Sequence, residues 1–244
     1  MAELWLVLAA SFLAALLALR LPRLKTPPGR PSLSLAAVFQ DLLRYGKTKS
    51  GCQPRPPQLQ VFDVPKRWFY HFYVVSVIWN GSVLLLLLQS HLLSRPFPIW
   101  LQDFLSILDG VSQDQDGGKD HRLTVCWYHV LGVLMFIWAS VHQHRCHVIL
   151  ANLRKNKSGK VLNLDHSIPF GDWFEFVSCP HYFAELLIYL SMAVMFGFNN
   201  LTWWLVVTYV FFSQAVSAVL CHEYYLSNFK QYPKCRKAYV PFLF

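Results

Sequence analysis

The longest stretch of this chain without a charged side chain extends from Leu186 to His222. One helix crosses the hydrocarbon core of a bilayer with about 20 residues, so this stretch is too long for a single span. Asn199 and Asn200 interrupt it with a turn signal and divide it into two predicted helices, at roughly 183–198 and 201–221. Two apolar helices joined by a tight turn indicate a helical, membrane-embedded fold.

Three further segments are apolar and free of charge: Leu4 to Leu19, Trp68 to Leu93 and Leu123 to His144. They bring the predicted number of spans to five. The segment from Phe97 to Leu108 is too short to span and is expected to be interfacial or re-entrant. Of all residues, 55% are hydrophobic and 14% are charged, whereas soluble domains carry roughly 25% charged residues. We predict an all-α polytopic membrane helix bundle, with residues 1–244 forming a single domain.

Basic residues are concentrated between the predicted spans, as is usual in membrane proteins. The loop from Leu21 to Arg67, the loop that begins at Arg145 and the C-terminal end carry most of the Lys and Arg side chains, so we expect all three in the cytosol. The segment from Ser94 to Arg122 is richer in Asp and is expected in the lumen. Five spans then give a lumenal N-terminus and a cytosolic C-terminus. A cleavable leader is disfavoured because the first segment has Glu3 and no preceding basic residue.

The same distribution excludes several classes of partner. The net charge of +9 does not indicate nucleic-acid binding, because the basic residues lie in these loops. The six cysteines form no C-x-x-C pair, and neither a G-x-G-x-x-G nor a P-loop pattern occurs. His142 and His147 bound a histidine-rich segment, but membrane di-iron hydroxylases need several histidine boxes and no H-x-x-H-H sequence is present. We expect neither nucleic acid nor metal.

Polar groups that could carry chemistry gather near the predicted cytosolic face. Glu185 lies at the start of an apolar helix, where an ionisable side chain usually faces a polar cavity or a partner. His222 follows the last apolar helix, where an interfacial histidine is the ordinary interpretation. Arg154 belongs to a basic cluster that could bind phosphate groups. The same cluster could instead only set the topology or contact anionic lipid headgroups.

Several blocks of the chain resemble, in order, the steroid 5α-reductase family of membrane enzymes. Each block alone is a weak signal, whereas their order and the C-terminal ending are specific, and they cover most of the chain. The blocks are Phe39 to Thr48, Phe62 to Trp68, Phe136 to Lys155, Ile168 to Ser178, Ala184 to Glu185, Thr202 to Trp204 and Tyr232 to Phe244.

The resemblance is nearest to the polyprenoid-reducing branch of this family. It implies an endoplasmic-reticulum oxidoreductase that uses NADPH to saturate a double bond conjugated to a carbonyl. The implied substrate is a polyprenoid lipid whose product enters dolichol synthesis and protein N-glycosylation, with a 3-oxo steroid as a further implied substrate. Such chemistry needs a donor directed at the developing oxyanion, a cation for the cofactor phosphates and apolar helices that exclude water.

Residues matched by position to the family's motifs are expected to bind the cofactor. Arg154 would bind phosphate, while Tyr182 and Glu185 would hold the nicotinamide or ribose side. Gln143 and His147 would line the cofactor end of the third span. His222 and Tyr225 would complete the pocket at the cytosolic end of the last span. The full set is Gln143, His147, Arg154, Tyr182, Glu185, His222 and Tyr225.

The chain also departs from the family pattern. Steroid-directed members carry a catalytic carboxylate in the second span, where this chain has Phe72. Its neighbours His71 and Tyr73 are therefore the candidate catalytic residues, and the change fits an isoprenoid better than a steroid. His181 replaces the Asn of a Pro-Asn-Tyr motif, which puts one cofactor hydrogen bond in doubt. Ser167 stands where a basic residue often precedes Ile-Pro-x-Gly.

The resemblance implies a seven-helix bundle, two helices more than we predict here. The family blocks continue to about Leu108 and resume near Trp127, with only a polar bridge between them. We therefore expect an internal deletion near residues 109–126. By the resemblance, it would also remove the tyrosine that the family uses as a proton donor and nearby cofactor-binding arginines. A shortened, catalytically silent membrane protein is the alternative to an active reductase. A membrane methyltransferase is disfavoured by the complete set of blocks, and an oxygenase by the incomplete histidine boxes.

Overall fold

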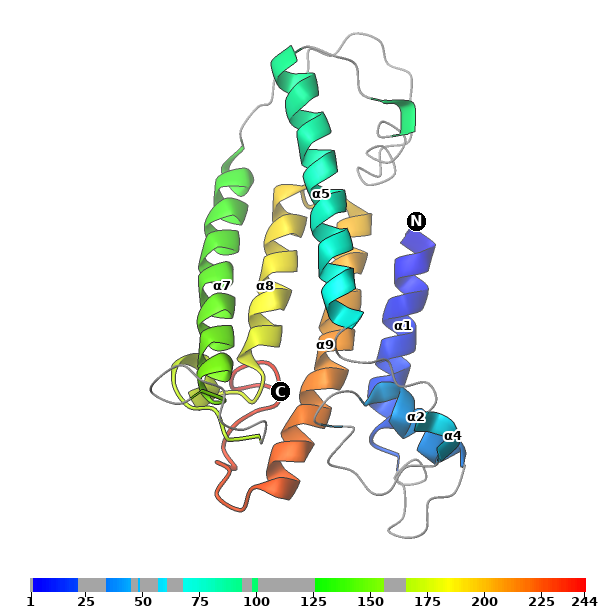
Figure 1. The fold of residues 1–244 in the computed structure, drawn as a ribbon, viewed down its shortest axis with the longest axis vertical. Helices are drawn as coiled ribbons and strands as arrows, with labels where there is room; N and C mark the ends of the chain where they lie inside the picture. The colour runs from blue at the N-terminus through cyan, green and yellow to red at the C-terminus, as the bar shows by residue number, and fades with distance from the viewer. Residues whose placement is uncertain are drawn as a thin grey trace. The chain divides into compact units, whose positions relative to one another are not determined.

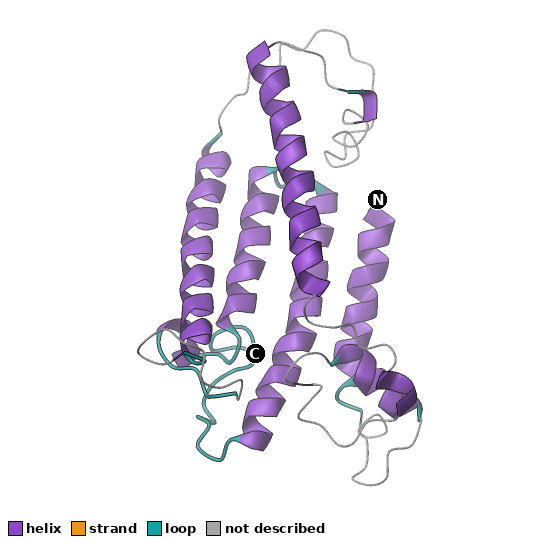
Figure 2. Cartoon of the chain, in the orientation of Figure 1, coloured by secondary structure: helices purple, strands orange, loops and turns teal. Residues whose placement is uncertain are grey.

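The computed structural model describes residues 2–21, 34–44, 48, 57–60, 68–93, 98–100, 126–155 and 166–244. Within these ranges the regular structure is helical, and an isolated parallel bridge joins Val177 to Lys237 (Figure 2). The predicted all-α class is confirmed. The chain divides into two compact units, Met1–Arg55 with Lys119–Phe244, and Pro56–Gly118.

The Pro56–Gly118 unit contains the short helix α4 (Pro57–Gln60) and the long helix α5 (Trp68–Leu93). The bounds of α5 are those of the charge-free segment in the sequence. Trp79 of α5 contacts Trp100, with 6.1 Å between the ring centroids. The predicted interfacial segment from Phe97 to Leu108 lies outside the described residues, apart from 98–100.

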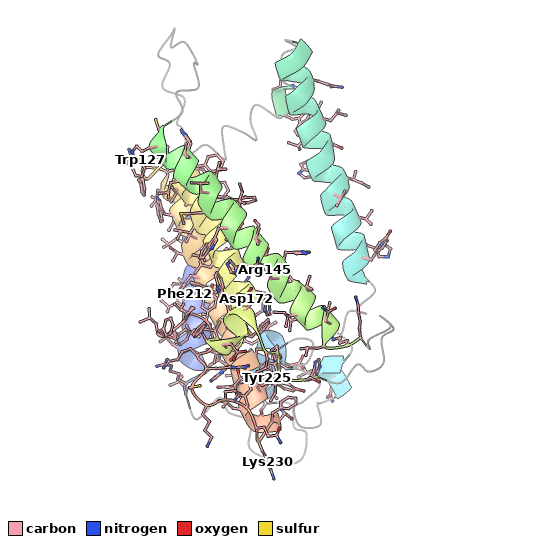
Figure 3. All side chains as sticks on the ribbon, turned by 90° about the vertical axis from the view of Figure 1, so that its left-hand side faces the viewer. Trp127, Arg145, Asp172, Phe212, Tyr225 and Lys230 are labelled. Carbon is pink, nitrogen blue, oxygen red and sulfur yellow. The ribbon has the colours of Figure 1, made fainter. Side chains whose placement is uncertain are left out.

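The larger unit is a bundle in which four long helices pack in the order α7, α8, α9, α1 (Figure 1). They are α1 (Ala2–Ala18), α7 (Trp127–Asn152), α8 (Pro180–Met195) and α9 (Leu201–Asn228). Trp127 and Lys230 mark the two ends of this unit (Figure 3). Each of the five apolar segments predicted from the sequence is therefore a helix. Two of them extend further than predicted, because α7 continues past His144 and α9 past Cys221.

The close approach of α7 and α8 depends on a glycine. A Cβ atom on Gly132 would lie 2.9 Å from the backbone oxygen of Ser191 and would also collide with the side chain of Met195. Small residues allow membrane helices to pack closely. Gly132 therefore fixes the α7–α8 contact.

The turn between α8 and α9 forms where the two asparagines predicted it. Gly197 has a φ of 93°, which favours glycine, and the Asn200 side chain accepts a hydrogen bond from the Trp203 backbone amide at 3.4 Å, capping α9. Phe196 stacks on Trp203 across the turn, with 4.5 Å between the ring centroids. The result is a tight helical hairpin.

Large apolar side chains cover the outside of this unit. Leu6 and Val7 of α1 and Leu134 of α7 are more than half exposed. Among the described helices, α9 is by itself long and apolar enough to cross a bilayer. Exposed apolar faces of this extent are typical of helices that contact lipid.

Two short elements lie beside the bundle and were not predicted. Helix α2 (Leu35–Leu43) begins at Ser34, whose hydroxyl accepts a hydrogen bond from the Ala37 backbone amide at 3.2 Å. The 3₁₀ helix η2 (Asp172–Glu175) follows Gly171, which has a φ of 94°. Both elements contribute residues to the candidate site that is described below.

The C-terminal segment (residues 229–244) folds back onto the start of α8. The backbone amide of Ser178 donates to the Lys237 oxygen at 2.9 Å, and the Lys237 amide donates to the Phe176 oxygen at 2.9 Å. Tyr239 is completely buried in the core beside Cys179. The segment is thus an integral part of the bundle.

Candidate functional site

A carboxyl group on an apolar helix marks the contact between α8 and α9. Glu185 of α8 is half-buried, and the side chain of Gln214 from α9 hydrogen-bonds its carboxyl group. A carboxyl group in an apolar bundle needs such a partner, because an unpaired one would be costly.

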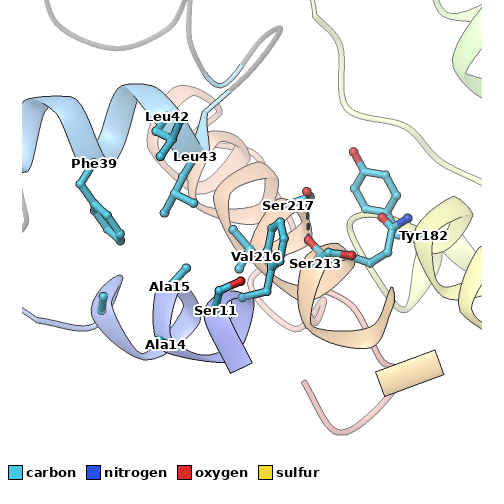
Figure 4. Close-up of a pocket in the computed structure, with 13 residues that line it drawn as sticks. Ser11, Ala14, Ala15, Phe39, Leu42, Leu43, Tyr182, Ser213, Val216 and Ser217 are labelled. Atoms are coloured by element: carbon cyan, nitrogen blue, oxygen red, sulfur yellow. Dashed lines mark hydrogen bonds between the residues drawn. The ribbon is translucent and has the colours of Figure 1, made fainter. Parts of the chain in front are cut away.

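Beside this pair lies a large apolar groove formed by α1, α2, α8 and α9. Its volume is about 960 Å³. Its walls are apolar side chains with a few hydroxyls. Tyr182 of α8 lines it together with Ser213 and Ser217 of α9 (Figure 4). Gln214 also lines the groove, so the carboxamide that holds Glu185 faces this space. An elongated apolar ligand with one polar end fits this arrangement.

A second polar cluster lies nearer the C-terminal end of α9. The hydroxyl oxygen of Ser178 is 2.6 Å from Nδ1 of His222 and 2.6 Å from the hydroxyl oxygen of Tyr232. It also lies 3.1 Å from the backbone oxygen of Lys237. Tyr225 stacks almost parallel to Tyr232, with 5.2 Å between the ring centroids. Burial raises the pKa of Tyr232, and the hydrogen bond between its hydroxyl and that of Ser178 partly offsets this rise.

A buried arginine anchors the C-terminal segment to the loop before η2. Arg236 is 2% exposed and donates from Nη1 to the Pro169 backbone oxygen at 2.8 Å. Its guanidinium carbon lies 4.7 Å from the centroid of the Phe170 ring and 5.4 Å from that of Tyr232. Its Nη2 atom is 3.8 Å from a carboxyl oxygen of the half-exposed Glu175. Arg236 thereby connects the C-terminal segment to the loop that precedes η2, next to the His222 cluster.

A cation-lined cavity of about 450 Å³ opens between the end of α1, the end of α9 and the C-terminal segment. Arg20, Lys234, Lys237 and His222 line it, together with Glu223. The apolar groove and this cavity follow one another along α1 and α9. On α1 and directly after it, Ser11, Ala15 and Ala18 are among the residues that line the first, whereas Leu16, Leu19 and Arg20 line the second.

A third cluster joins α7 to η2. His142 stacks on Trp173, with 4.2 Å between ring centroids and 13° between ring planes. Its Nδ1 lies 3.3 Å from Oδ1 of Asp172, although the two atoms do not align as a hydrogen bond. Within the described ranges, no three His, Cys, Asp or Glu side chains lie together as metal ligands would.

The structure brings some of the sequence-predicted site residues together. Tyr182 lines the apolar groove, and Glu185 contacts Gln214, which also lines it. His222 and Tyr225 belong to the Ser178 cluster. The His147 ring on α7 contacts that of His181, with 5.6 Å between centroids.

The other candidates are on α7, just beyond it, and on α5. Gln143 is half-buried on α7, and Arg154 is exposed just beyond its end, and neither lines the groove or the cation-lined cavity. Of the catalytic candidates on α5, His71 is exposed, and the side chain of Tyr73 lies outside the described residues. The roles of all these residues remain predictions.

Sequence reasoning missed four residues that build the site: Ser178, Gln214, Tyr232 and Arg236. Gln214 could have been found from the sequence, because it is the only carboxamide side chain between Leu201 and Cys221. Ser178, Tyr232 and Arg236 lie inside blocks that resemble the family, but no local pattern indicates that they meet.

Comparison with known proteins identifies the class. The family model described as 3-oxo-5-alpha-steroid 4-dehydrogenase matches residues 104–244. The chain belongs to this steroid 5α-reductase family, whose members are oxidoreductases that act on a carbon–carbon double bond.

Within the family, the chain is similar to proteins named polyprenal reductase. It is 48% identical to that of Ailuropoda melanoleuca over 99% of this chain and 95% of the relative. It is 46% identical to that of Homo sapiens over 98% and 94%, and 45% identical to that of Xenopus tropicalis over 100% and 99%.

The lengths of these alignments carry further information. The alignment to the Ailuropoda melanoleuca protein extends over 309 positions, whereas this chain has 244 residues. At least 65 positions (309 minus 244) therefore hold a residue of the relative and none of this chain.

Proposed function

We propose that this chain is an NADPH-dependent reductase of the endoplasmic-reticulum membrane that saturates the α,β-double bond of a polyprenoid, in the route to dolichol and protein N-glycosylation. The observation that carries the proposal is its 48% identity to a polyprenal reductase over 99% of its length. The apolar groove, with polar groups on one wall, supports a lipid with a single polar end. A 3-oxo steroid is a second substrate, suggested by the description of the matching family.

The residues around the two cavities fit a dinucleotide cofactor. A carboxamide group needs paired donors and acceptors, which Gln214 and Glu185 offer beside the groove. Phosphate groups need cations, which Arg20, Lys234 and Lys237 offer in the neighbouring cavity. NADPH, when bound, would supply the hydride for the β-carbon of the substrate.

The chain's own residues would orient and shield the reacting groups. Glu185 and Gln214 would fix the polar end of the bound molecules, Tyr182 would close one side, and the apolar walls would exclude water. Arg154 stays the phosphate ligand proposed from its motif. His71 and Tyr73 stay the candidates that protonate or polarise the substrate.

A second candidate function follows from the missing alignment positions. A shortened, catalytically silent family member is favoured by the 309 aligned positions against 244 residues. We propose that the deletion lies near residues 109–126, between the family blocks. The groove and the Ser178 cluster consist of residues outside that range, so their contacts with a cofactor would survive, while the family's proton donor and nearby cofactor-binding arginines would be lost.

The deciding experiment compares the purified chain with a full-length polyprenal reductase in identical lipid nanodiscs. NADPH binding and NADPH-dependent reduction of a polyprenal are measured separately, with Arg154→Ala as a control. We expect binding with little or no turnover. Turnover that matches the full-length relative would exclude the silent form, and absence of both binding and turnover would contradict the proposed function.

We further propose that the N-terminus is lumenal and the C-terminus cytosolic. The basic loops support this orientation. A C-terminal tag should bind antibody in cells permeabilised only at the plasma membrane. A tag that remains inaccessible until the internal membranes are dissolved would contradict the orientation.

A further inference from the structure

Ser178 sits at the centre of a buried polar cluster whose hydrogen positions follow from simple counting. The Ser178 hydroxyl has one proton to donate and two lone pairs to accept with. It has three neighbours within hydrogen-bond distance: Nδ1 of His222 at 2.6 Å, the Tyr232 hydroxyl at 2.6 Å and the Lys237 backbone oxygen at 3.1 Å. Ser178 is 2% exposed, so water does not replace any of these partners.

The Lys237 oxygen fixes the direction of the first bond. A backbone oxygen can only accept, so the Ser178 proton must point toward it for this contact to be a hydrogen bond. Both lone pairs of the serine oxygen then remain for the two other neighbours. All three contacts are satisfied only if Tyr232 and His222 both donate to Ser178.

The surroundings of Tyr232 agree with this direction. The Arg236 guanidinium lies 5.4 Å from the centroid of the Tyr232 ring. Its positive charge and its hydrogen bonding both lower the pKa of the Tyr232 hydroxyl. An arginine can only donate, so the lone pairs of the tyrosine oxygen are favoured on the Arg236 side. The tyrosine proton is then directed to Ser178.

We infer that Ser178 is a positioning residue that holds His222 with its proton on Nδ1 and thereby presents an unprotonated Nε2 as a hydrogen-bond acceptor. His222 lines the cation-lined cavity. The lining therefore combines the donors Arg20, Lys234 and Lys237 with two acceptors, Nε2 of His222 and the carboxylate of Glu223.

The tautomer determines what His222 can bind. Cations in the cavity suit phosphate oxygens, whereas a bare Nε2 suits a hydroxyl or amide group that donates a proton. In a cofactor such as NADPH, His222 would therefore contact a ribose hydroxyl and leave the phosphates to the cations. Only this last step rests on the proposed function, because the tautomer itself depends on the buried cluster alone.

The experiment measures the tautomer directly. The full chain is labelled with ¹⁵N-histidine in nanodiscs, and the His222 signals are assigned as those lost in His222→Gln. Nitrogen–proton correlations at pH 8 then show which ring nitrogen carries the proton. We expect Nδ1–H in the wild type, a mixture of tautomers in Ser178→Ala and retention of Nδ1–H in Ser178→Thr.

Two outcomes would overturn the inference: Nε2–H as the main wild-type form, or an unchanged tautomer in a folded Ser178→Ala. If Ser178→Ala does not fold, the wild-type spectrum decides the matter by itself. NADPH titration of the same samples should show about tenfold weaker binding in Ser178→Ala, as expected for one misplaced hydrogen bond. A wild type that binds no NADPH but shows Nδ1–H would contradict the proposed function and leave the tautomer assignment standing.

Discussion

Replacing Arg236 by Met should loosen the C-terminal segment, and the size of the effect can be worked out from its contacts. The charged hydrogen bond to the Pro169 oxygen at 2.8 Å is worth about 1.5–3 kcal/mol. The contacts with the Phe170 and Tyr232 rings add about 0.5–2 kcal/mol. The pair with Glu175 adds at most about 1 kcal/mol, because that carboxyl is half exposed and 3.8 Å away.

An opposing contribution reduces the sum. Two nitrogens of the guanidinium, Nε and Nη2, are buried and have no hydrogen-bond partner among the residues that the structure describes, and Met removes this cost. We therefore expect Arg236→Met to lower the free energy of unfolding by about 2–4 kcal/mol.

The assay is SDS titration of the purified chain in mixed micelles, followed by far-ultraviolet circular dichroism. Lys234→Met is the matched control, because Lys234 is exposed on the same segment and should change stability little. Arg236→Lys should fall between the two, since it keeps the charge but loses the planar group that stacks on the rings. A loss below about 1 kcal/mol in Arg236→Met would refute the reasoning that this residue anchors the segment.

Further expectations concern the cofactor, the buried tyrosines and helix packing. Arg154→Ala should weaken NADPH binding about tenfold or more in calorimetry, with Lys155→Ala as control, and equal affinities would reject Arg154 as the phosphate ligand. Tyr239→Phe should raise the free energy of unfolding by about 1 kcal/mol, because the Tyr239 hydroxyl is fully buried with no hydrogen-bond partner within the described part of the chain; a clear loss of stability would show a hidden partner. Burial raises the pKa of both Tyr232 and Tyr239 above the ordinary value of 10.0. The unfolded chain therefore loses these protons first, stability should be constant below pH 10 and fall above it, and the fall should be smaller in Tyr239→Phe. Gly132→Leu should unfold at lower SDS than wild type, because its side chain would collide with Ser191 and Met195; an unchanged midpoint would show that α7 and α8 can separate without loss.

The helices of this bundle were predictable because each depends on a local property of the sequence. Asn200 caps α9 where the turn signal indicated, and α5 has the bounds of its charge-free segment. The end of α7 was misplaced because the prediction stopped at the first charge, Arg145, whereas a helix can continue into water beyond the membrane. Helix α2 was missed because it lies in a polar, basic loop that carries no span-length apolar pattern.

The candidate site was predictable only in part. Glu185 stands out because a carboxyl in an apolar helix is unusual, but its partner Gln214 comes from another helix. Ser178 meets residues 44 and 54 positions away in the sequence, and no local pattern carries such a contact. Family motifs predicted Tyr225 and His222 as site residues, whereas the serine that joins His222 to the C-terminal segment emerged only from the fold.

The pairing of α1 with α9 determines when this protein can first hold a ligand during its synthesis. The groove has one wall from the first helix and another from the last. A ribosome synthesises α1 long before α9 exists, so the groove cannot form until the chain is nearly complete. A ligand of the groove, added during synthesis, would therefore protect finished chains from proteolysis but not nascent ones.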